Sequence, residues 1–119
     1  MATLKVAVYV ELNGVPLEGY PITRRLEVDE TQQFDFTYAT GGGYVTIPSS
    51  LATVQALLLR SDKAVTVRLD AQSDAGIELS AGGMLLVMDA TINAGAATNA
   101  TVSNASGADA QIEGIVGGT

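Results

Sequence analysis

The chain contains no histidine and no cysteine, which limits the chemistry that its side chains can perform. Histidine is the commonest general base and metal ligand, and it completes most Ser-His and Cys-His nucleophile pairs. Thiolate metal sites and disulfide bonds both need cysteine. Most familiar catalytic arrangements are therefore excluded, and we expect no catalytic residue, no cofactor and no metal ion.

Carboxylates are the acid–base groups that remain. A pair of them flanks the scissile bond in glycosidases. The candidates by residue type are Glu11, Glu27, Asp35 and Glu78. Sugar clefts normally stack aromatic rings against the sugar, whereas this chain has four Tyr, two Phe and no Trp. A glycosidase site is weakly supported, and we predict that the protein is not an enzyme.

Two further patterns could be mistaken for ligand sites. Oxygen-bearing side chains recur at Asp70, Gln72, Asp74 and Glu78, but the Gly and Glu positions of an EF-hand loop are absent, so we predict a solvated turn. The three glycines at 41–43 are followed by the strand-like residues 44–47. A phosphate-binding loop would run into a helix instead, so the glycines predict a plain loop.

Charge is unevenly distributed along the chain, whose formal net charge is −7. All six Lys and Arg residues lie at or before Arg68, and six acidic residues follow it without a basic one. Nucleic-acid binding needs clustered Lys and Arg, so we expect no nucleic-acid partner. A basic partner surface is favoured instead.

The basic doublet Arg24-Arg25 is the clearest candidate for charged contacts with a partner. Arginine pairs with carboxylates through parallel hydrogen bonds, which suits a protein–protein contact. Two outward charges on a solvated strand would look the same in the sequence. Both interpretations stay open.

The elements that carry these residues read as strands. Residues 4–12 have Leu or Val at every second position, and residues 22–29 and 33–38 also alternate, which predicts half-buried strands. Asn13-Gly14 suits a tight hairpin turn. Most of the N-terminal third is therefore expected to be β-structure.

Residues 54–70, VQALLLRSDKAVTVRLD, predict two strands joined by a tight turn at 61–64. We expect them to pair as a hairpin at the centre of the fold, because the turn returns the β-branched residues 65–67 alongside the first arm. Residues 48–50 could instead cap a helix, which leaves 51–60 open between strand and helix. We favour a short turn near 49–52 and then a strand.

Beyond residue 70, short strand patterns at 77–80, 84–89, 99–103 and 109–116 alternate with turns of small residues. We expect a loop over 90–100, because Asn, Gly and Thr interrupt its alanines. Such regular turn spacing is typical of a sandwich or barrel.

The run 84–88, MLLVM, is apolar on both faces and has two interpretations. It favours a central strand buried on both sides. Alternatively, one face lies in the core and the other contacts a neighbouring subunit, with Leu85 and Val87 as the contacting residues.

The C-terminal residues 112–119 could form an extended arm. Ile115 and Val116 are followed by two glycines and a threonine, so an apolar anchor sits near a flexible end that could pair with a neighbour's sheet edge. Fraying of the terminus is an equally good interpretation. We nominate Ile115 and Val116 as partner contacts.

Length and composition complete the fold prediction. With 119 residues, 47% hydrophobic and 5% aromatic, the chain suits one domain with an aliphatic core. The longest apolar run is too short to cross a bilayer and the N-terminus lacks a leader pattern, so we expect a soluble protein with no membrane partner. We predict that residues 1–119 form an all-β domain, an antiparallel, jelly-roll-like β-sandwich of about eight strands.

Three segments together resemble small structural proteins of tailed bacteriophages. They are LLLRSDKAVTVRLD at 57–70, AGGMLLVMDATI at 81–92 and ATVSNASGADAQIEGIVGG at 100–118. The resemblance covers roughly the C-terminal half and rests on the order of strands and turns. It implies a β-sandwich or jelly-roll domain on the virion surface, synthesised in the cytoplasm of a bacterial host.

The resemblance implies a role in capsid decoration. Such a cement protein sits over junctions between subunits of the major capsid protein, often as a homotrimer, and stabilises the assembled shell. The alternatives are a phage tail or connector component and a carbohydrate- or receptor-binding module. In the last case Tyr38 and Tyr44, beside the glycine loop, would be the exposed aromatic residues.

Overall fold

The computed structural model describes residues 1–40, 44–47, 51, 53–69, 76–93 and 101–119. Within these ranges the chain is all-β, with twelve strands and no helix. The strands are β1 Ala2–Val8, β2 Glu11–Leu12, β3 Val15–Pro16, β4 Ile22–Val28, β5 Glu30–Tyr38, β6 Tyr44–Thr46, β7 Thr53–Ser61, β8 Val65–Arg68, β9 Ile77–Leu79, β10 Met84–Asn93, β11 Thr101–Ser103 and β12 Ala110–Gly118.

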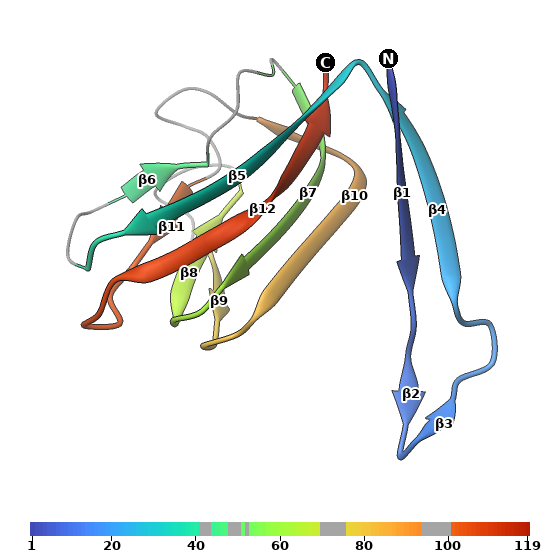
Figure 1. The fold of residues 1–119 in the computed structure, drawn as a ribbon, viewed down its shortest axis with the longest axis horizontal. Coiled ribbons are helices and arrows are strands. Elements are labelled where there is room, and N and C mark those ends of the chain that lie inside the picture. The colour runs from blue at the N-terminus through green and yellow to red at the C-terminus, as the bar shows by residue number, and fades with distance from the viewer. Residues whose placement is uncertain (41–43, 48–50, 52, 70–75, 94–100) are drawn as a thin grey trace.

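The strands pair in four antiparallel sheets, which confirms the predicted all-β class. Two sheets have four strands each: sheet I has the order β10-β7-β12-β5, and sheet II has the order β6-β11-β8-β9. The other two sheets have two strands each, β1-β4 and β2-β3. We call sheets I and II together the body of the molecule (Figure 1).

Buried side chains of both four-stranded sheets form one hydrophobic cluster. It includes Leu57 and Leu59 of β7, Ile112 of β12, Val67 of β8 and Val102 of β11. The cluster is almost wholly aliphatic, as the composition predicts, and alternation along β7 and β12 places every second residue on the opposite face of sheet I. That opposite face is called the outer face below.

Residues 51–60 are strand and not helix where they are described, because β7 runs from Thr53 to Ser61. The predicted turn near 49–52 falls almost entirely outside the described residues. The predicted hairpin pairing, however, is wrong: β7 pairs with β10 and β12, whereas β8 pairs with β9 and β11. The short connection carries the chain from sheet I to sheet II, and Ser61 Oγ donates a hydrogen bond to Lys63 O at 2.8 Å within it.

The strand β10 corrects two predictions. It continues to Asn93, so residues 90–93 belong to a strand and not to the expected loop, while residues 94–100 lie outside the described part of the chain. Leu85 and Val87 pack against the hydrophobic cluster, whereas Met84 and Leu86 are exposed. The favoured prediction of a central strand buried on both sides is wrong, because β10 is the last strand in the order of sheet I and only its Leu85 and Val87 face packs on the core. The nomination of Leu85 and Val87 as subunit contacts stays a prediction.

The C-terminal residues 112–119 do not form an extended arm. They lie in β12, which pairs with β5 along one edge and with β7 along the other. Val116 is buried in the core, so it is not available to a partner, whereas Ile115 is half-buried on the outer face. The terminus is an interior strand because both of its edges are hydrogen-bonded.

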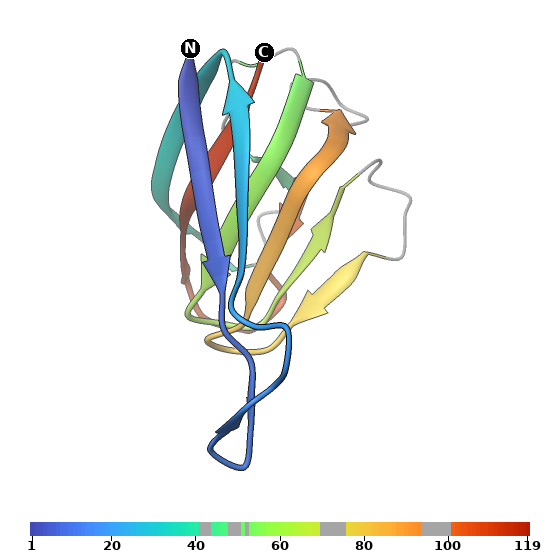
Figure 2. The same cartoon turned by 90° about the vertical axis from the view of Figure 1, so that its right-hand side faces the viewer.

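The N-terminal residues form a long hairpin that we call the arm. Its stem is the sheet β1-β4, in which Leu4 faces Leu26 and Val6 faces Arg24, and its tip comprises residues 9–21. The predicted Asn13-Gly14 turn is confirmed, with φ angles of 54° and 80°. Figures 1 and 2 show the stem as a separate layer beside sheet I and the tip extending beyond the body.

Tyr38 is buried in the core at 5% exposure, and its hydroxyl has no hydrogen-bond partner among the described residues. A buried, unpaired hydroxyl destabilises the folded state, so Tyr38→Phe should raise the free energy of unfolding by about 1 kcal/mol. Burial also raises the pKa of Tyr38 above its ordinary value of 10.0. Because the pKa of Tyr38 is higher in the folded state than in the unfolded state, its contribution to the free energy of unfolding is constant below about pH 10. This contribution falls as the pH rises further, because the unfolded state then releases the hydroxyl proton more readily.

Urea unfolding of wild type and Tyr38→Phe between pH 8 and pH 11 measures both effects. The advantage of the variant should be constant below the ordinary pKa of tyrosine and should widen above it, because only the wild type loses stability there through residue 38. Parallel stability curves across this range would contradict the assignment.

Candidate functional site

The structure does not bring the candidate carboxylates together. Glu11, Glu27, Asp35 and Glu78 lie on β2, β4, β5 and β9, and no two of these strands belong to the same sheet. Among the described residues, no group of three or more acidic side chains is placed to hold a metal ion. Asp70, Gln72, Asp74 and the glycines at 41–43 lie outside the described residues, so their predicted turn and loop stay predictions.

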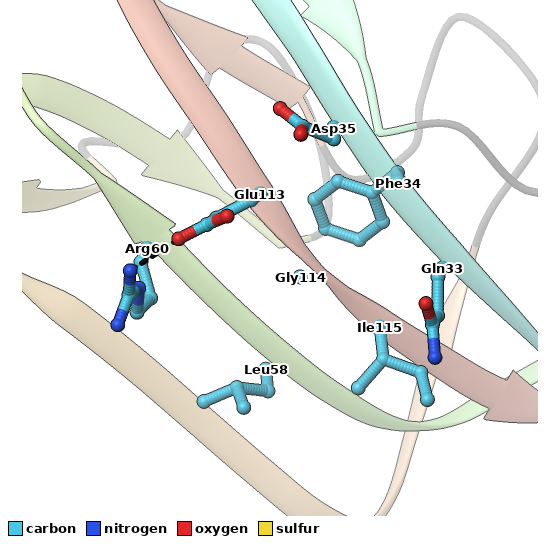
Figure 3. A pocket seen from close by; sticks show the side chains of 8 residues that line it. All are labelled: Gln33, Phe34, Asp35, Leu58, Arg60, Glu113, Gly114 and Ile115. Atoms are coloured by element: carbon cyan, nitrogen blue, oxygen red, sulfur yellow. Dashed lines mark hydrogen bonds and ion pairs between the residues drawn. The ribbon is translucent and has the colours of Figure 1, made fainter.

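A shallow depression lies on the outer face of sheet I. It has a volume of about 480 Å³. Figure 3 shows Gln33 and Asp35 from β5, Leu58 and Arg60 from β7, and Glu113 and Ile115 from β12 around it, with Phe34 and Gly114 between the strands.

The charged side chains of this depression, Asp35, Arg60 and Glu113, each have a polar partner. Arg60 forms an ion pair with Glu113 across β7 and β12 (Figure 3). On the neighbouring pair of strands, Gln111 Nε2 donates to Asp35 Oδ1, and Thr37 Oγ1 donates to Gln111 Oε1 at 2.8 Å. The arrangement is a solvent-exposed ladder of cross-strand contacts, which suits a contact surface and presents no activated nucleophile.

The Arg60–Glu113 pair should contribute little to folding. Both side chains are exposed, at 61% and 44%, and exposed ion pairs are typically worth about 0–1 kcal/mol. We expect Glu113→Gln to change the free energy of unfolding by less than about 1 kcal/mol in urea titrations at low salt, with a smaller difference at high salt. A loss of several kcal/mol would show that this pair organises the sheet.

A second concave feature lies between the arm and the body. We call it the groove; its volume is about 210 Å³. Its walls are the stem strand β1 and the outer face of sheet I. The lining is predominantly aliphatic, with Leu4, Val6, Ala56, Leu58, Leu86, Met88 and Ile115 as its main side chains.

The tip of the arm carries an unusual amount of exposed apolar surface. Every residue from Glu11 to Arg25 is exposed. Six of the ten large exposed hydrophobic residues in the described chain lie in or beside the tip: Tyr9, Leu12, Val15, Leu17, Tyr20 and Ile22. A concentration of apolar side chains on a projecting element indicates a binding surface.

The basic doublet does not form one charged patch. Arg24 faces Val6 and Arg25 faces Lys5 in the register of the stem, so the two arginines point to opposite faces of the hairpin. Both are exposed, and neither forms an ion pair with another described residue. Arg24 therefore lies on the same face of the stem as Leu4 and Val6, beside the groove.

Of the six nominated contact residues, only Val116 is buried in the core. Arg24 and Arg25 are exposed on the stem, Ile115 lines the groove, and Leu85 and Val87 are partly buried against the core cluster. The accessible apolar residues that sequence reasoning missed are Leu12, Val15, Met84 and Leu86. Period-two alternation indicates two faces of a strand, but it does not indicate whether another layer covers them.

The candidate aromatic platform for a glycan is not formed by Tyr38, which is buried. The side chain of Tyr44 is outside the described part of the structure. The exposed tyrosines that are described, Tyr9 and Tyr20, belong to the arm.

Comparison with protein-family models, with curated proteins and with solved structures finds no match to this chain. Within the described ranges, no helix is long and apolar enough to cross a membrane. The groove and the exposed apolar tip of the arm are the two features of the described structure that suggest binding.

Proposed function

We propose that the protein is a structural protein of a bacteriophage virion, and specifically a capsid decoration protein. It would bind the outer surface of the shell formed by the major capsid protein and stabilise that shell through protein–protein contacts, without catalysing a reaction. The observation that carries a structural, non-catalytic role is the arm, because it projects beyond the body and presents exposed aliphatic and aromatic side chains for contacts between protein chains (Figure 2).

We further propose that the body is a jelly-roll sandwich. When its strands β5 to β12 are numbered one to eight, the sheet orders are 1-8-3-6 and 2-7-4-5. Successive strands thus change sheet at every step except from β8 to β9, which pair directly. This order, with one cluster of buried side chains shared by both sheets, supports the eight-stranded jelly roll that many capsid and lectin domains use.

The working form is proposed to be a homotrimer at the virion surface. A symmetric oligomer multiplies weak contacts with a symmetric shell, so binding becomes tight although each contact is small. The net charge of −7 disfavours the packaged nucleic acid as a partner and favours basic patches on the shell.

Purified protein added to heads of the encoding phage that were assembled without it tests this function. We expect saturable co-sedimentation at a fixed ratio to the capsid protein and a higher temperature of head disruption, because a ligand that binds only the assembled state stabilises it by mass action. An unrelated protein of equal net charge serves as the control. Binding to tails but not to heads would favour the tail or connector alternative and overturn decoration.

A further inference from the structure

The tip of the arm and the groove have complementary surfaces. The tip presents Leu12 and Val15, which are 63% and 64% exposed and face each other across β2 and β3. The groove is lined by aliphatic side chains, and Leu86 at its edge is 39% exposed. Both surfaces expose apolar area to water. Docking of one surface against the other would bury this area, which favours association.

Charges on the two surfaces are also complementary. The tip, residues 9–21, carries Glu11 and Glu18 and no basic residue. The stem strands carry Lys5, Arg24 and Arg25 against a single acid, Glu27. Arg24 lies on the groove side of the stem, whereas Lys5, which pairs with Arg25, points its side chain to the other face. Neither forms an ion pair with another described residue. An acidic apolar tip therefore matches a basic apolar groove.

The tip cannot fill the groove of its own chain. Leu4 and Val6 of the stem are part of the groove wall, and Leu12 lies six residues further along the same hairpin. At about 3.3 Å per strand residue the separation is roughly 20 Å, directed away from the groove. Figures 1 and 2 show the tip beyond the end of the body. The occupant must come from another molecule.

We infer that the groove binds the arm tip of a second copy of this chain. Leu12 and Val15 of one copy enter the groove of the next, where Arg24 faces Glu11 and Glu18. Tip and groove are different surfaces, so a contact made in one direction is heterologous, and we place it around the threefold axis of the proposed homotrimer, where it closes into a ring. The inference deepens the proposed function, on which it rests for the setting, by assigning the interface of the proposed homotrimer.

The absence of cysteine from the natural chain allows a direct test by cross-linking. Leu12→Cys and Leu86→Cys variants are purified separately, mixed and oxidised. We expect a mixed disulfide of two chains, because a docked tip brings these positions within bonding distance. Ala39→Cys replaces Leu86→Cys in the control; this exposed residue follows β5 on the side of the body away from the arm (Figure 1). Equal cross-linking of Leu12→Cys to both partners would overturn the inference.

Solution mass provides a second test that does not depend on disulfide geometry. A variant with Leu12→Glu and Val15→Glu alters only exposed positions, and Ile77→Glu alters a matched exposed position on sheet II. By sedimentation velocity at micromolar concentrations, wild type and Ile77→Glu should be oligomers, while the tip variant should associate at least tenfold more weakly. All three should unfold at similar temperatures. A monomeric wild type, or a tip variant that associates normally, would contradict the interface.

A charge-exchange series identifies the partner surfaces. Arg24→Glu should weaken association, and mixing this variant with a Glu11→Lys, Glu18→Lys variant should restore a hetero-oligomer, because the reversed groove then meets a reversed tip. Failure of the mixture to associate, while each variant remains folded, would count against docking of tip in groove.

The outcomes separate this inference from the proposed function. Oligomers with the predicted cross-link that do not bind heads would retain the interface and overturn decoration. Protein that binds heads at a fixed ratio but gives no tip–groove cross-link would retain decoration and overturn the interface.

Discussion

A Gly114→Ala variant should lose about 3 kcal/mol or more of folding free energy, a large part of the roughly 5–15 kcal/mol that stabilises a typical domain. A Cβ at this position would lie 1.8 Å from the carbonyl oxygen of Leu58 and 2.8 Å from the Phe34 ring. The ring could shift, but the carbonyl belongs to the neighbouring strand β7. Relief of the clash would require separation of strands at the centre of sheet I.

Gly117→Ala is the matched control, since it is on the same strand. Its Cβ would approach Val28 at 3.4 Å and Thr31 at 3.6 Å, which are ordinary packing distances. We expect this variant to remain folded, with a change of less than about 1 kcal/mol. Urea unfolding monitored by circular dichroism compares the two, and equal losses would show that the close approach at Gly114 is not what requires glycine.

The second large effect is expected at Asn104, which is buried and bonded through both ends of its amide. Its Nδ2 donates to Tyr38 O at 3.0 Å and to Ala108 O at 2.9 Å. Its Oδ1 accepts from Ser106 N at 3.1 Å and from Ser106 Oγ at 2.7 Å. Asn104→Ala removes all four bonds and should cost about 2–3 kcal/mol, since each buried group left without its partner carries a desolvation penalty.

Asn104→Asp separates the two halves of this network. The aspartate retains the acceptor for Ser106 but loses both donors to the carbonyls of Tyr38 and Ala108. We expect destabilisation that grows with pH as the carboxyl ionises near these carbonyl oxygens. If the free energy of unfolding of Asn104→Ala lay within about 0.5 kcal/mol of the wild-type value, the amide would not be what holds residues 104–108 against β5.

The sequence predicts strands well where one face is buried and the other is wet. β1, β4, β5, β7 and β8 all lie within segments that alternate or have β-branched runs. Pairing is harder to infer, because alternation specifies the faces of a strand and says nothing of which strand lies beside it. The connection at residues 62–64 is as short as a hairpin loop, yet it joins two sheets.

The prediction of an extended C-terminal arm at 112–119 is wrong for a related reason. Gly117 and Gly118, followed by Thr119, predicted a flexible end. In the structure, Gly114 and Gly118 lie where a Cβ would meet a neighbouring strand's carbonyl oxygen. These glycines permit close strand approach in an interior strand and do not mark mobility.

The candidate site could be predicted only in part. The exposed arginines of the stem follow from their residue type, but the hydrophobic run at 84–88 wrongly favoured a strand buried on both faces, because Met84 and Leu86 are exposed. Which face is open depends on the layer packed against it: sheet II covers Leu85 and Val87, whereas the arm leaves Met84 and Leu86 exposed. Which layer covers which face is a property of the tertiary structure, and it leaves no pattern in the local sequence.

Electron cryomicroscopy of heads saturated with the protein tests the central claim most directly. We predict additional density on the outer surface of the shell, repeated at symmetry-equivalent positions, and large enough for the body with its arm contacting a neighbouring copy. A shell whose outer surface is unchanged at saturating protein, in a preparation where the protein is folded, would contradict a role in capsid decoration.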